Sequence, residues 1–251
     1  MSSLPSSNTS LTYTLPSTPP HLTHTPLLPP SPTEILVKIH TAAINPVDIQ
    51  LWGNPVVGWL AGKKEKGLGC DYSGSIVALG SEIQKSGKWN VGDEVYGLCS
   101  RPMGEGTFAQ YLCVKQGEPI AKKPTSLTHQ EAAAVPLVVL TAFSMLDWLP
   151  AASQSPNEKR RVVVAGASGG VGIWVVQLAK QMYDCHVIGI CSGRNAQFVK
   201  ELGADEVIDY SKGDVAKTLL EGRPGGKKYD LYADCVGGTE MFNHWVRNLI
   251  L

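Results

Sequence analysis

The chain has 251 residues, and at about 150 residues per domain this length corresponds to between one and two domains. Its 22 Lys and Arg residues equal its 22 Asp and Glu residues, and a net charge of zero argues against nucleic acid or an anionic membrane as the main partner. Hydrophobic residues make up 43% of the chain, and no run approaches the roughly 20 apolar residues of a membrane span. The composition therefore predicts a soluble α/β or mixed protein.

Residues 1–33 contain no charged side chain, and Pro, Ser and Thr dominate them. Because such a segment has too little apolar surface to offset the entropy of its ordering, we expect an extended arm or a disordered lead-in. It lacks the Arg residues of a mitochondrial transit peptide and the apolar core of a secretory signal, so we expect a cytoplasmic location. The six cysteines include no C-x-x-C pair, which favours free thiols over disulfides or a metal site.

Residues 34–150 are expected to form a β-rich domain that ends in a connecting helix. Strand patterns separated by glycine turns occur at residues 35–40, 72–79, 94–98 and 107–114. Residues 128–149 are typical of a helix, with Thr128 as its N-cap and Glu131 at the capping-box position.

Residues 151–251 alternate strictly between strand and helix patterns. Strands are expected at residues 162–165, 186–191, 206–209 and 229–235, and helices at residues 171–182, 196–202, 215–221 and from Thr239 onward. This order predicts a parallel sheet with helices on both faces, the doubly wound α/β arrangement whose full form has about six strands. Because only four strands are expected, the sequence predicts a partial fold that is truncated after the fourth strand.

A glycine-rich motif joins the first of these strands to the first helix. It has the A-x-G-x-x-G form of a dinucleotide-binding fingerprint and reads Ala167-Ser168-Gly169-Gly170-Val171-Gly172. Its glycines allow a tight turn and a close approach to a pyrophosphate, and the helix N-terminus supplies N–H groups to the anion. The alternative is a tight glycine turn that binds no ligand.

The end of the second strand favours NADPH over NADH. An NAD site has an acidic residue about 20 positions after the glycine motif, which bonds the ribose 2′-hydroxyl, whereas residues 191–195 contain no carboxylate. Ser192 and Arg194 suit a 2′-phosphate, because a guanidinium pairs with phosphate through two hydrogen bonds. The alternative is that Arg194 is a solvated helix residue and that Ser192 only caps this helix.

Segments in both halves of the chain carry a family resemblance. They are AAINPVD at residues 42–48, GCDYSG at 69–74, VGDEVYG at 91–97, GTFAQY at 106–111, VAGASGGVG at 164–172, VQLAK at 176–180 and LGADEVIDY at 202–210. Together they resemble the zinc-independent medium-chain dehydrogenase/reductases, and most closely the quinone oxidoreductase-like proteins, from about Glu34 to Gly238. The resemblance implies a GroES-like β domain followed by a Rossmann domain, with NADPH in the cleft between them.

The resemblance also implies roles for individual residues. The pyrophosphate is expected at Ser168, Gly169, Gly170 and Val171. The 2′-phosphate is expected at Ser192, Arg194 and Tyr210. Asn45, the expected catalytic residue, and Thr141 would contact the nicotinamide end. The alternatives are that Asn45 begins a turn before a proline and that Thr141 satisfies its hydroxyl within its own helix. Asp48 is expected to cap the segment after Pro46 and to lie outside the site.

The zinc ligands of the zinc-dependent relatives are not matched in this sequence. The His-Glu pair of those relatives corresponds to Cys70-Asp71, their first catalytic cysteine falls within residues 45–48, and their four-cysteine loop is absent. Without a metal to polarise an alcohol, the resemblance implies an acceptor that is already electrophilic, a quinone or an α,β-unsaturated carbonyl. Hydride would pass from NADPH to this acceptor, with a hydrogen bond from Asn45 or Tyr72 to the developing oxyanion.

The alternative function is that of a catalytically incomplete relative, which keeps the fold and weak nucleotide binding. By resemblance, the fifth and sixth strands would carry contacts to the nicotinamide and much of a homodimer interface, and without them the fourth strand is an exposed edge. The expected partner is a small-molecule carbonyl or quinone, with no nucleic acid, no membrane span and an incomplete dimer interface.

Overall fold

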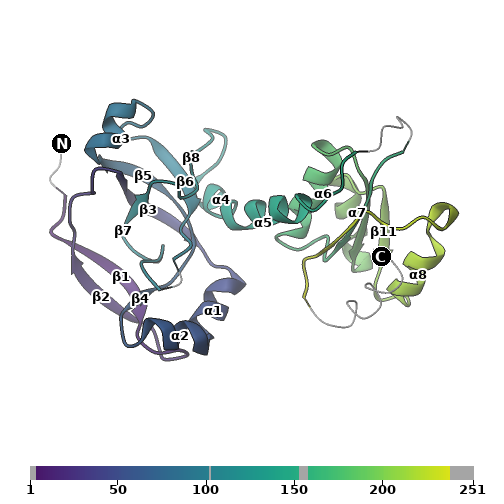
Figure 1. Cartoon of the computed structure of the whole chain (residues 1–251), viewed down its shortest axis with the longest axis horizontal. Helices are drawn as coiled ribbons and strands as arrows, with labels where there is room; N and C mark the ends of the chain where they lie inside the picture. Colours follow the sequence, from purple (N-terminus) through teal and green to yellow (C-terminus); the bar gives the residue numbers. More distant parts are fainter. Residues whose placement is uncertain (1–3, 102, 153–157, 238–251) are drawn as a thin grey trace. The chain divides into compact units, whose positions relative to one another are not determined.

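The chain forms two compact units, Met1–Leu137 and Val138–Leu251 (Figure 1). The structure, a computed structural model, describes residues 4–101, 103–152 and 158–237. The units divide inside helix α5 (Pro136–Leu146), which is earlier than the expected boundary between residues 150 and 151. The reason is packing, because Ala142 and Leu146 of this helix belong to the hydrophobic core of the second unit.

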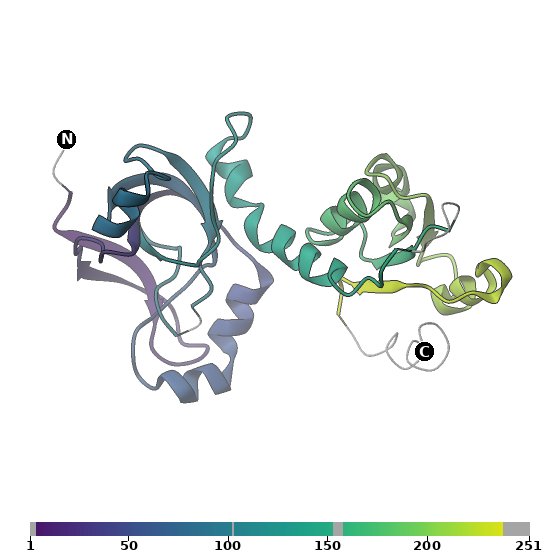
Figure 2. The same cartoon turned by 45° about the horizontal axis from the view of Figure 1, so that its top comes forward.

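A five-stranded antiparallel sheet forms the centre of the first unit. Its strand order is β7 (Tyr111–Lys115), β3 (Glu34–Ala43), β5 (Asp71–Leu79), β6 (Glu94–Leu98) and β8 (Ile120–Lys122). The turned view shows this sheet as a strongly curved layer (Figure 2). Its core contains Val37, Tyr72, Ile76 and Leu112, which are almost fully buried. The expected strands at residues 72–79 and 94–98 are confirmed to within one residue, whereas the strand expected from residue 107 begins only at Tyr111.

The prediction of an N-terminal arm was wrong, because most of this segment forms part of the first unit. Strands β1 (Ser7–Tyr13) and β2 (His21–Pro26) pair with each other, and β1 also pairs with the short β4 (Lys66–Gly67). The Leu11 N–H donates to the Phe108 carbonyl over 2.8 Å, which adds β1 to the rest of the unit. Backbone hydrogen bonds therefore hold a segment whose uncharged composition indicated little burial.

The first unit also contains the short helices α1 (Pro46–Gly53), α2 (Pro55–Ala61) and α3 (Ser81–Ser86), which were not expected. The helix expected at residues 128–149 is divided into α4 (His129–Ala133) and α5. Pro136 causes the break, since proline has no N–H and disfavours helical backbone in the residue before it. The expected capping box is confirmed, because the Thr128 N–H donates to Glu131 and the Glu131 N–H donates to the Thr128 hydroxyl.

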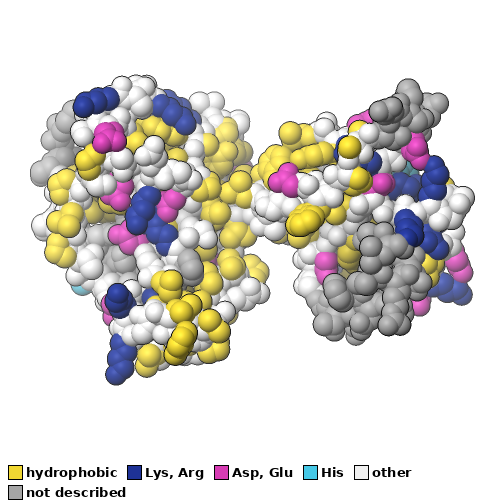
Figure 3. Space-filling model, in the orientation of Figure 1, with side chains coloured by type: hydrophobic (Ala, Val, Ile, Leu, Met, Phe, Trp, Pro, Cys, Tyr) yellow, Lys and Arg dark blue, Asp and Glu magenta, His cyan; other side chains and the backbone are white. Residues whose placement is uncertain are grey.

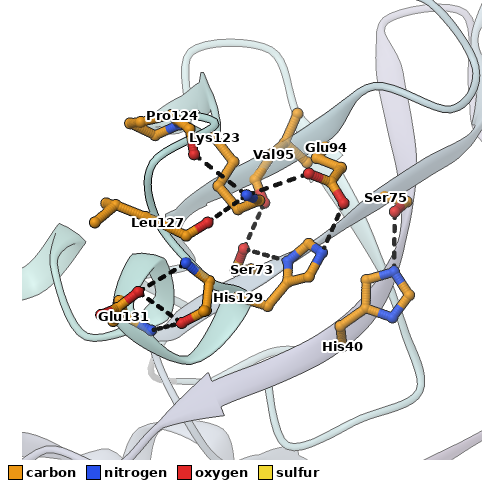
Figure 4. Close-up of polar contacts among 11 residues, drawn as sticks. His40, Ser73, Ser75, Glu94, Val95, Lys123, Pro124, Leu127, His129 and Glu131 are labelled. Carbon is orange, nitrogen blue, oxygen red and sulfur yellow. Dashed lines mark hydrogen bonds and ion pairs between the residues drawn. The ribbon is translucent and has the colours of Figure 1, made fainter.

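His129 fastens α4 to the five-stranded sheet (Figure 4). Its Nδ1 lies 2.8 Å from the Ser73 hydroxyl on β5, and its Nε2 lies 3.2 Å from a carboxylate oxygen of Glu94 on β6. The His40 ring lies beside it, with 4.6 Å between ring centroids. Both ring nitrogens of His129 thus have partners on different strands, which fixes α4 relative to the sheet.

The second unit contains a parallel sheet of four described strands. In chain order these are β9 (Arg161–Ala165), β10 (His186–Cys191), β11 (Glu206–Asp209) and β12 (Leu231–Asp234), and their spatial order is β11-β10-β9-β12. The described helices of this unit, besides α5, are α6 (Gly172–Gln181), α7 (Ala196–Glu201) and α8 (Val215–Glu221), with the short 3-10 helices η1 (Gly193–Asn195) and η2 (Pro224–Gly226). This confirms the predicted doubly wound α/β class.

Apolar residues cover both faces of this parallel sheet. Val162 and Val164 of β9 belong to one core cluster, whereas Val163 and Ala165, which alternate with them, belong to another. The helix expected from Thr239 lies outside the described residues. No helix in the described part of the chain combines the length and the apolar composition that a membrane span requires.

Candidate active site

The glycine motif forms a tight turn between β9 and α6, as expected. Gly166 has a φ of +68°, a conformation that glycine adopts without the steric cost of a side chain. A Cβ atom on Gly172 would lie 2.2 Å from the Gly166 carbonyl oxygen, so the start of α6 packs directly against the turn. Two glycines are therefore required by the backbone itself, with or without a ligand.

Three backbone N–H groups of this turn have no acceptor among the described residues, and they indicate a bound ligand in addition to the steric need for glycine. Among the described residues, no hydrogen bond uses the N–H groups of Ser168, Gly170 or Val171. They lie at the N-terminus of α6, a ten-residue helix whose dipole favours a negative charge there. This arrangement suits an anion such as a pyrophosphate.

A cavity of about 1030 Å³ lies along the carboxyl ends of the strands of the second unit. Its wall brings together five of the predicted cofactor residues, which are Ser168, Gly169, Ser192, Arg194 and Tyr210. The other two predicted pyrophosphate residues, Gly170 and Val171, belong to the same turn but do not line the cavity. Asn195 joins two parts of the wall, since its side-chain amide donates to the Ser168 hydroxyl over 3.0 Å.

Arg194 and Tyr210 are exposed at the rim of this cavity. In the part of the chain that the structure describes, the Arg194 guanidinium has no hydrogen-bond or ion-pair partner. Tyr210 is 58% exposed, and its N–H donates to the Cys191 carbonyl, which places it beside the end of β10. A free guanidinium, the Ser192 hydroxyl and a phenol at one rim form a set of donors that suits a phosphate group.

Asp209 lies next to the predicted 2′-phosphate residues but was not predicted from the sequence. It lies opposite Cys191 in the pairing of β11 with β10, and a Cβ atom on Gly193 would approach its Oδ2 within 2.2 Å. Hydrogen bonds from the Ser211 hydroxyl and N–H lower the pKa of the Asp209 carboxyl. The signal was its place at the end of the third strand, which in a parallel sheet lies at the same edge as residues 191–195.

Asn45 lies in the first unit, at the start of α1, and is 7% exposed. Its side-chain nitrogen donates to Asp71 Oδ2 over 2.9 Å, and its backbone N–H donates to Asp48 Oδ2 over 2.8 Å. Asp48 thus caps the segment after Pro46, as expected. The catalytic role of Asn45 stays a prediction, since its observed contacts are within its own unit.

Asp71, the partner of the Asn45 side chain, is another residue that the sequence analysis did not assign to the site. It is fully buried, and its Oδ1 accepts the Leu137 N–H over 2.9 Å near the beginning of α5. Burial raises the pKa of the Asp71 carboxyl to about 6, with the negative charge of Asp48 as a further raising influence, while the two hydrogen bonds act in the opposite direction.

Two further predicted contacts involve Tyr72 and Thr141. Tyr72, the alternative donor to the oxyanion, is fully buried in the core of the first unit, and burial strongly raises the pKa of its phenol. It therefore cannot reach a substrate, which corrects that expectation. Thr141 lies on α5 in the second unit and is half-buried, and its contact with a nicotinamide stays a prediction.

The cysteines and acidic residues of the described segments form no group of three or more that could hold a metal ion. All six cysteines have free thiols. Burial raises the pKa of the Cys70 thiol to about 12, so this residue carries a proton near neutral pH. At the His-Glu position of the zinc-dependent relatives, the Asp71 carboxylate is occupied by Asn45 and Leu137 rather than open to a ligand.

Two family models match the chain. The alcohol dehydrogenase GroES-like domain matches residues 31–125, and a model described as zinc-binding dehydrogenase matches residues 170–249. The chain is 34% identical to the mitochondrial NAD(P)H oxidoreductase RTN4IP1 of Bos taurus, over 83% of this chain and 53% of the relative. It is 35% identical to the chloroplastic quinone-oxidoreductase homolog of Spinacia oleracea, over 80% of this chain and 59% of the relative.

Among solved structures, the quinone oxidoreductase from Coxiella burnetii is similar, with a TM-score of 0.78 and 29% identity. That match covers 97% of this chain and 73% of the solved chain. The chain spans about half the length of the curated relatives it matches. Because the two relatives are named mitochondrial and chloroplastic, they lend no support to a cytoplasmic location, which stays a prediction.

Three findings indicate the same family: the sheet of the GroES-like unit, the parallel sheet with its glycine turn, and the matching family models. The chain therefore belongs to the medium-chain dehydrogenase/reductases, in the zinc-independent, quinone oxidoreductase-like group.

Proposed function

We propose that the chain binds NADPH and transfers hydride from it to a quinone or an α,β-unsaturated carbonyl. The observation that carries the choice of cofactor is Arg194, whose guanidinium is exposed at the cavity rim and has no partner among the described residues. With Ser192 and Tyr210 at the same rim, it offers charge-assisted and neutral hydrogen bonds to a 2′-phosphate.

The shape of the glycine turn supports a bound dinucleotide. Ser168, Gly170 and Val171 would hold the pyrophosphate through N–H groups that have no other acceptor in the described residues. Asn195 supports this role indirectly, because it fixes the Ser168 side chain. When bound, the nicotinamide supplies the hydride, and the protein contributes its position and the exclusion of water.

The surroundings of Asn45 support an apolar acceptor. Ile44 directly before it and Ile49 on α1 are exposed, and hydrophobic side chains gather over α1 and α2 (Figure 3). Asn45 uses one side-chain N–H for Asp71, and an amide nitrogen carries a second N–H. We assign this second N–H to the oxygen of the acceptor, where a hydrogen bond would stabilise negative charge as hydride arrives.

The names of the two relatives agree with this proposal. One is named an NAD(P)H oxidoreductase and the other a quinone-oxidoreductase homolog. Neither name specifies NADPH, and neither identifies the acceptor of this chain. For the homodimer of the family, we expect an incomplete interface in this chain, and this part of the proposal rests on the family alone.

The cofactor is tested by titrating the purified chain with NADPH and NADH while the fluorescence of its six Trp residues is recorded. We expect tighter binding of NADPH, and we expect Arg194→Ala to weaken that binding by roughly 10- to 100-fold with little effect on NADH. Lys200→Ala, which removes an exposed cation outside the cavity wall, is the matched control. Equal affinity of the unaltered chain for the two cofactors would contradict the assignment.

The reaction is tested by following NADPH oxidation with simple quinones and enones. Turnover of any of them supports hydride transfer. If NADPH binds but no acceptor in the panel is reduced, the alternative is correct, and the chain is a nucleotide-binding relative without catalysis.

A further inference from the structure

Asp71 is an unusual carboxylate because both groups that bond it are neutral. Its Oδ2 accepts from the Asn45 amide and its Oδ1 from the Leu137 N–H, while the side chain is fully buried. Burying a carboxylate is unfavourable unless its partners compensate for lost hydration, and neutral donors compensate less than a cation does. A purely structural link between these two donors could be made by a neutral side chain.

An ionised carboxylate differs from any neutral replacement because it can only accept hydrogen bonds. Asn45 must therefore turn its nitrogen, and not its oxygen, toward ionised Asp71. This fixes which end of the Asn45 amide faces Asp71 and leaves the second N–H of that amide as a donor.

The protonated form of Asp71 would have the reverse effect. The Leu137 N–H still requires an acceptor, so Oδ1 keeps that hydrogen bond and the proton is carried by Oδ2. An Oδ2–H facing Asn45 donates, and it bonds best if the amide rotates by half a turn to present its oxygen. Rotation removes the Asn45 donor from its former position, and no covalent bond is made or broken.

We propose that Asp71 is a positioning residue whose ionisation sets the orientation of the Asn45 amide. This inference rests on the proposed function only for its catalytic consequence, namely that the second N–H of Asn45 bonds the acceptor oxygen. The orientation of the amide can be tested with or without turnover.

Burial places this equilibrium in an accessible pH range, since it raises the pKa of the Asp71 carboxyl to about 6. The titratable groups that act on Asp71 and its neighbour Cys70 are Asp48, whose charge raises the pKa of Asp71, and the Cys70 and Cys99 thiols. Burial raises the pKa of these thiols to about 12 and about 11, so both stay neutral where Asp71 titrates. Asp48 accepts the hydrogen bond from the Asn45 backbone N–H whether Asp71 is ionised or protonated.

Asp71→Asn tests this arrangement without removing a hydrogen bond. The Leu137 N–H requires the oxygen of the new amide, so its nitrogen faces Asn45 and imposes the rotated state at every pH. Asp93→Asn is the matched control, because Asp93 also accepts a backbone N–H in a turn but does not touch Asn45.

The first readout is the side-chain ¹H–¹⁵N signal of Asn45, assigned by its loss in Asn45→Ser. We expect the signal to move with pH around a midpoint near 6 in the unaltered chain and in Asp93→Asn, and to stay constant in Asp71→Asn. A pH-independent Asn45 signal in the unaltered chain would overturn the proposal, whatever its activity.

The second readout is steady-state kinetics with NADPH and an acceptor. We expect Asp71→Asn to lower kcat roughly 100-fold, the scale of losing one oxyanion donor, with an unchanged Kd for NADPH. The unaltered chain should lose kcat below pH 6, and the variant should lack this acid limb. If the unaltered chain has no activity at all, the proposed function fails while the NMR measurement still decides the role of Asp71.

Discussion

Asp209 Oδ2 occupies the space into which a side chain at Gly193 would extend, since a Cβ atom there would lie only 2.2 Å away. Gly193 directly follows Ser192, one of the residues assigned to the 2′-phosphate. The turn after β10 is therefore built against a carboxylate, and this carboxylate is ionised at neutral pH because hydrogen bonds from Ser211 lower its pKa.

This relationship predicts that Asp209 weakens the binding of NADPH. A negative charge next to a 2′-phosphate opposes the attraction of Arg194, so Asp209→Asn should lower the Kd for NADPH several-fold and leave that for NADH nearly unchanged. The measurement is the fluorescence titration repeated at two salt concentrations, because screening should reduce the difference. An increase in NADPH Kd would instead mean that Asp209 acts by holding the turn.

A second prediction concerns the stability of the glycine turn. Gly172→Ala should destabilise the protein by about 1–3 kcal/mol or more, since the added methyl group would collide with the Gly166 carbonyl oxygen at 2.2 Å. Gly213→Ala is the control, because a Cβ atom there meets nothing within 4 Å. Urea unfolding of the three proteins measures the difference, and equal loss in both variants would contradict the steric argument.

The second unit was largely predictable from its sequence, because burial on both faces leaves continuous apolar runs such as residues 162–165. Strands β10 and β11 and helix α8 have the predicted ends. By contrast, β1 and β2 were missed because their stability comes from backbone pairing, which leaves no hydrophobic signal in an uncharged Pro-rich segment.

The candidate site was predictable where it is local and not where it depends on strand register. The glycine turn and residues 192–194 follow single strands, so a motif identifies them. Asp209 lies beside the end of β10 because it pairs with Cys191, and in the other unit Asp71 lies beside Asn45 because it pairs with Ala43 on the neighbouring strand. The spacing of residues along the sequence does not reveal such pairs.

A third prediction concerns the attachment of α4 to the sheet. His129→Ala removes the contacts with Ser73 and Glu94 and, among the described residues, leaves the buried Ser73 hydroxyl with the Val95 carbonyl as its one remaining partner (Figure 4). We expect a loss of about 1–2 kcal/mol in the free energy of unfolding, measured with urea at pH 7. His24→Ala serves as the control, since the exposed His24 side chain has one hydrogen bond among the described residues, to Thr9, and a comparable loss in it would count against the attachment.

The last prediction is that Asp71 makes folding stability depend on pH. Its carboxyl has a pKa of about 6 in the folded protein, against about 3.9 in an unfolded chain, so the folded state holds the proton more tightly. The stabilising effect of this proton is complete below pH 4 and is lost as the pH rises through 6, a change on the order of 2–3 kcal/mol. Asp71→Asn has no such proton, and its stability relative to the unaltered chain should therefore rise between pH 4.5 and 7.5.

Urea unfolding at several pH values within that range measures this relative stability. Asp93→Asn should show no comparable trend, because hydrogen bonding already lowers the pKa of Asp93 and it titrates below the range. A constant difference between Asp71→Asn and the unaltered chain would show that Asp71 is ionised throughout, and the Asn45 amide would then have one orientation at every pH tested. A rising difference would mean that the fold gives up stability at neutral pH to keep a carboxylate beside Asn45.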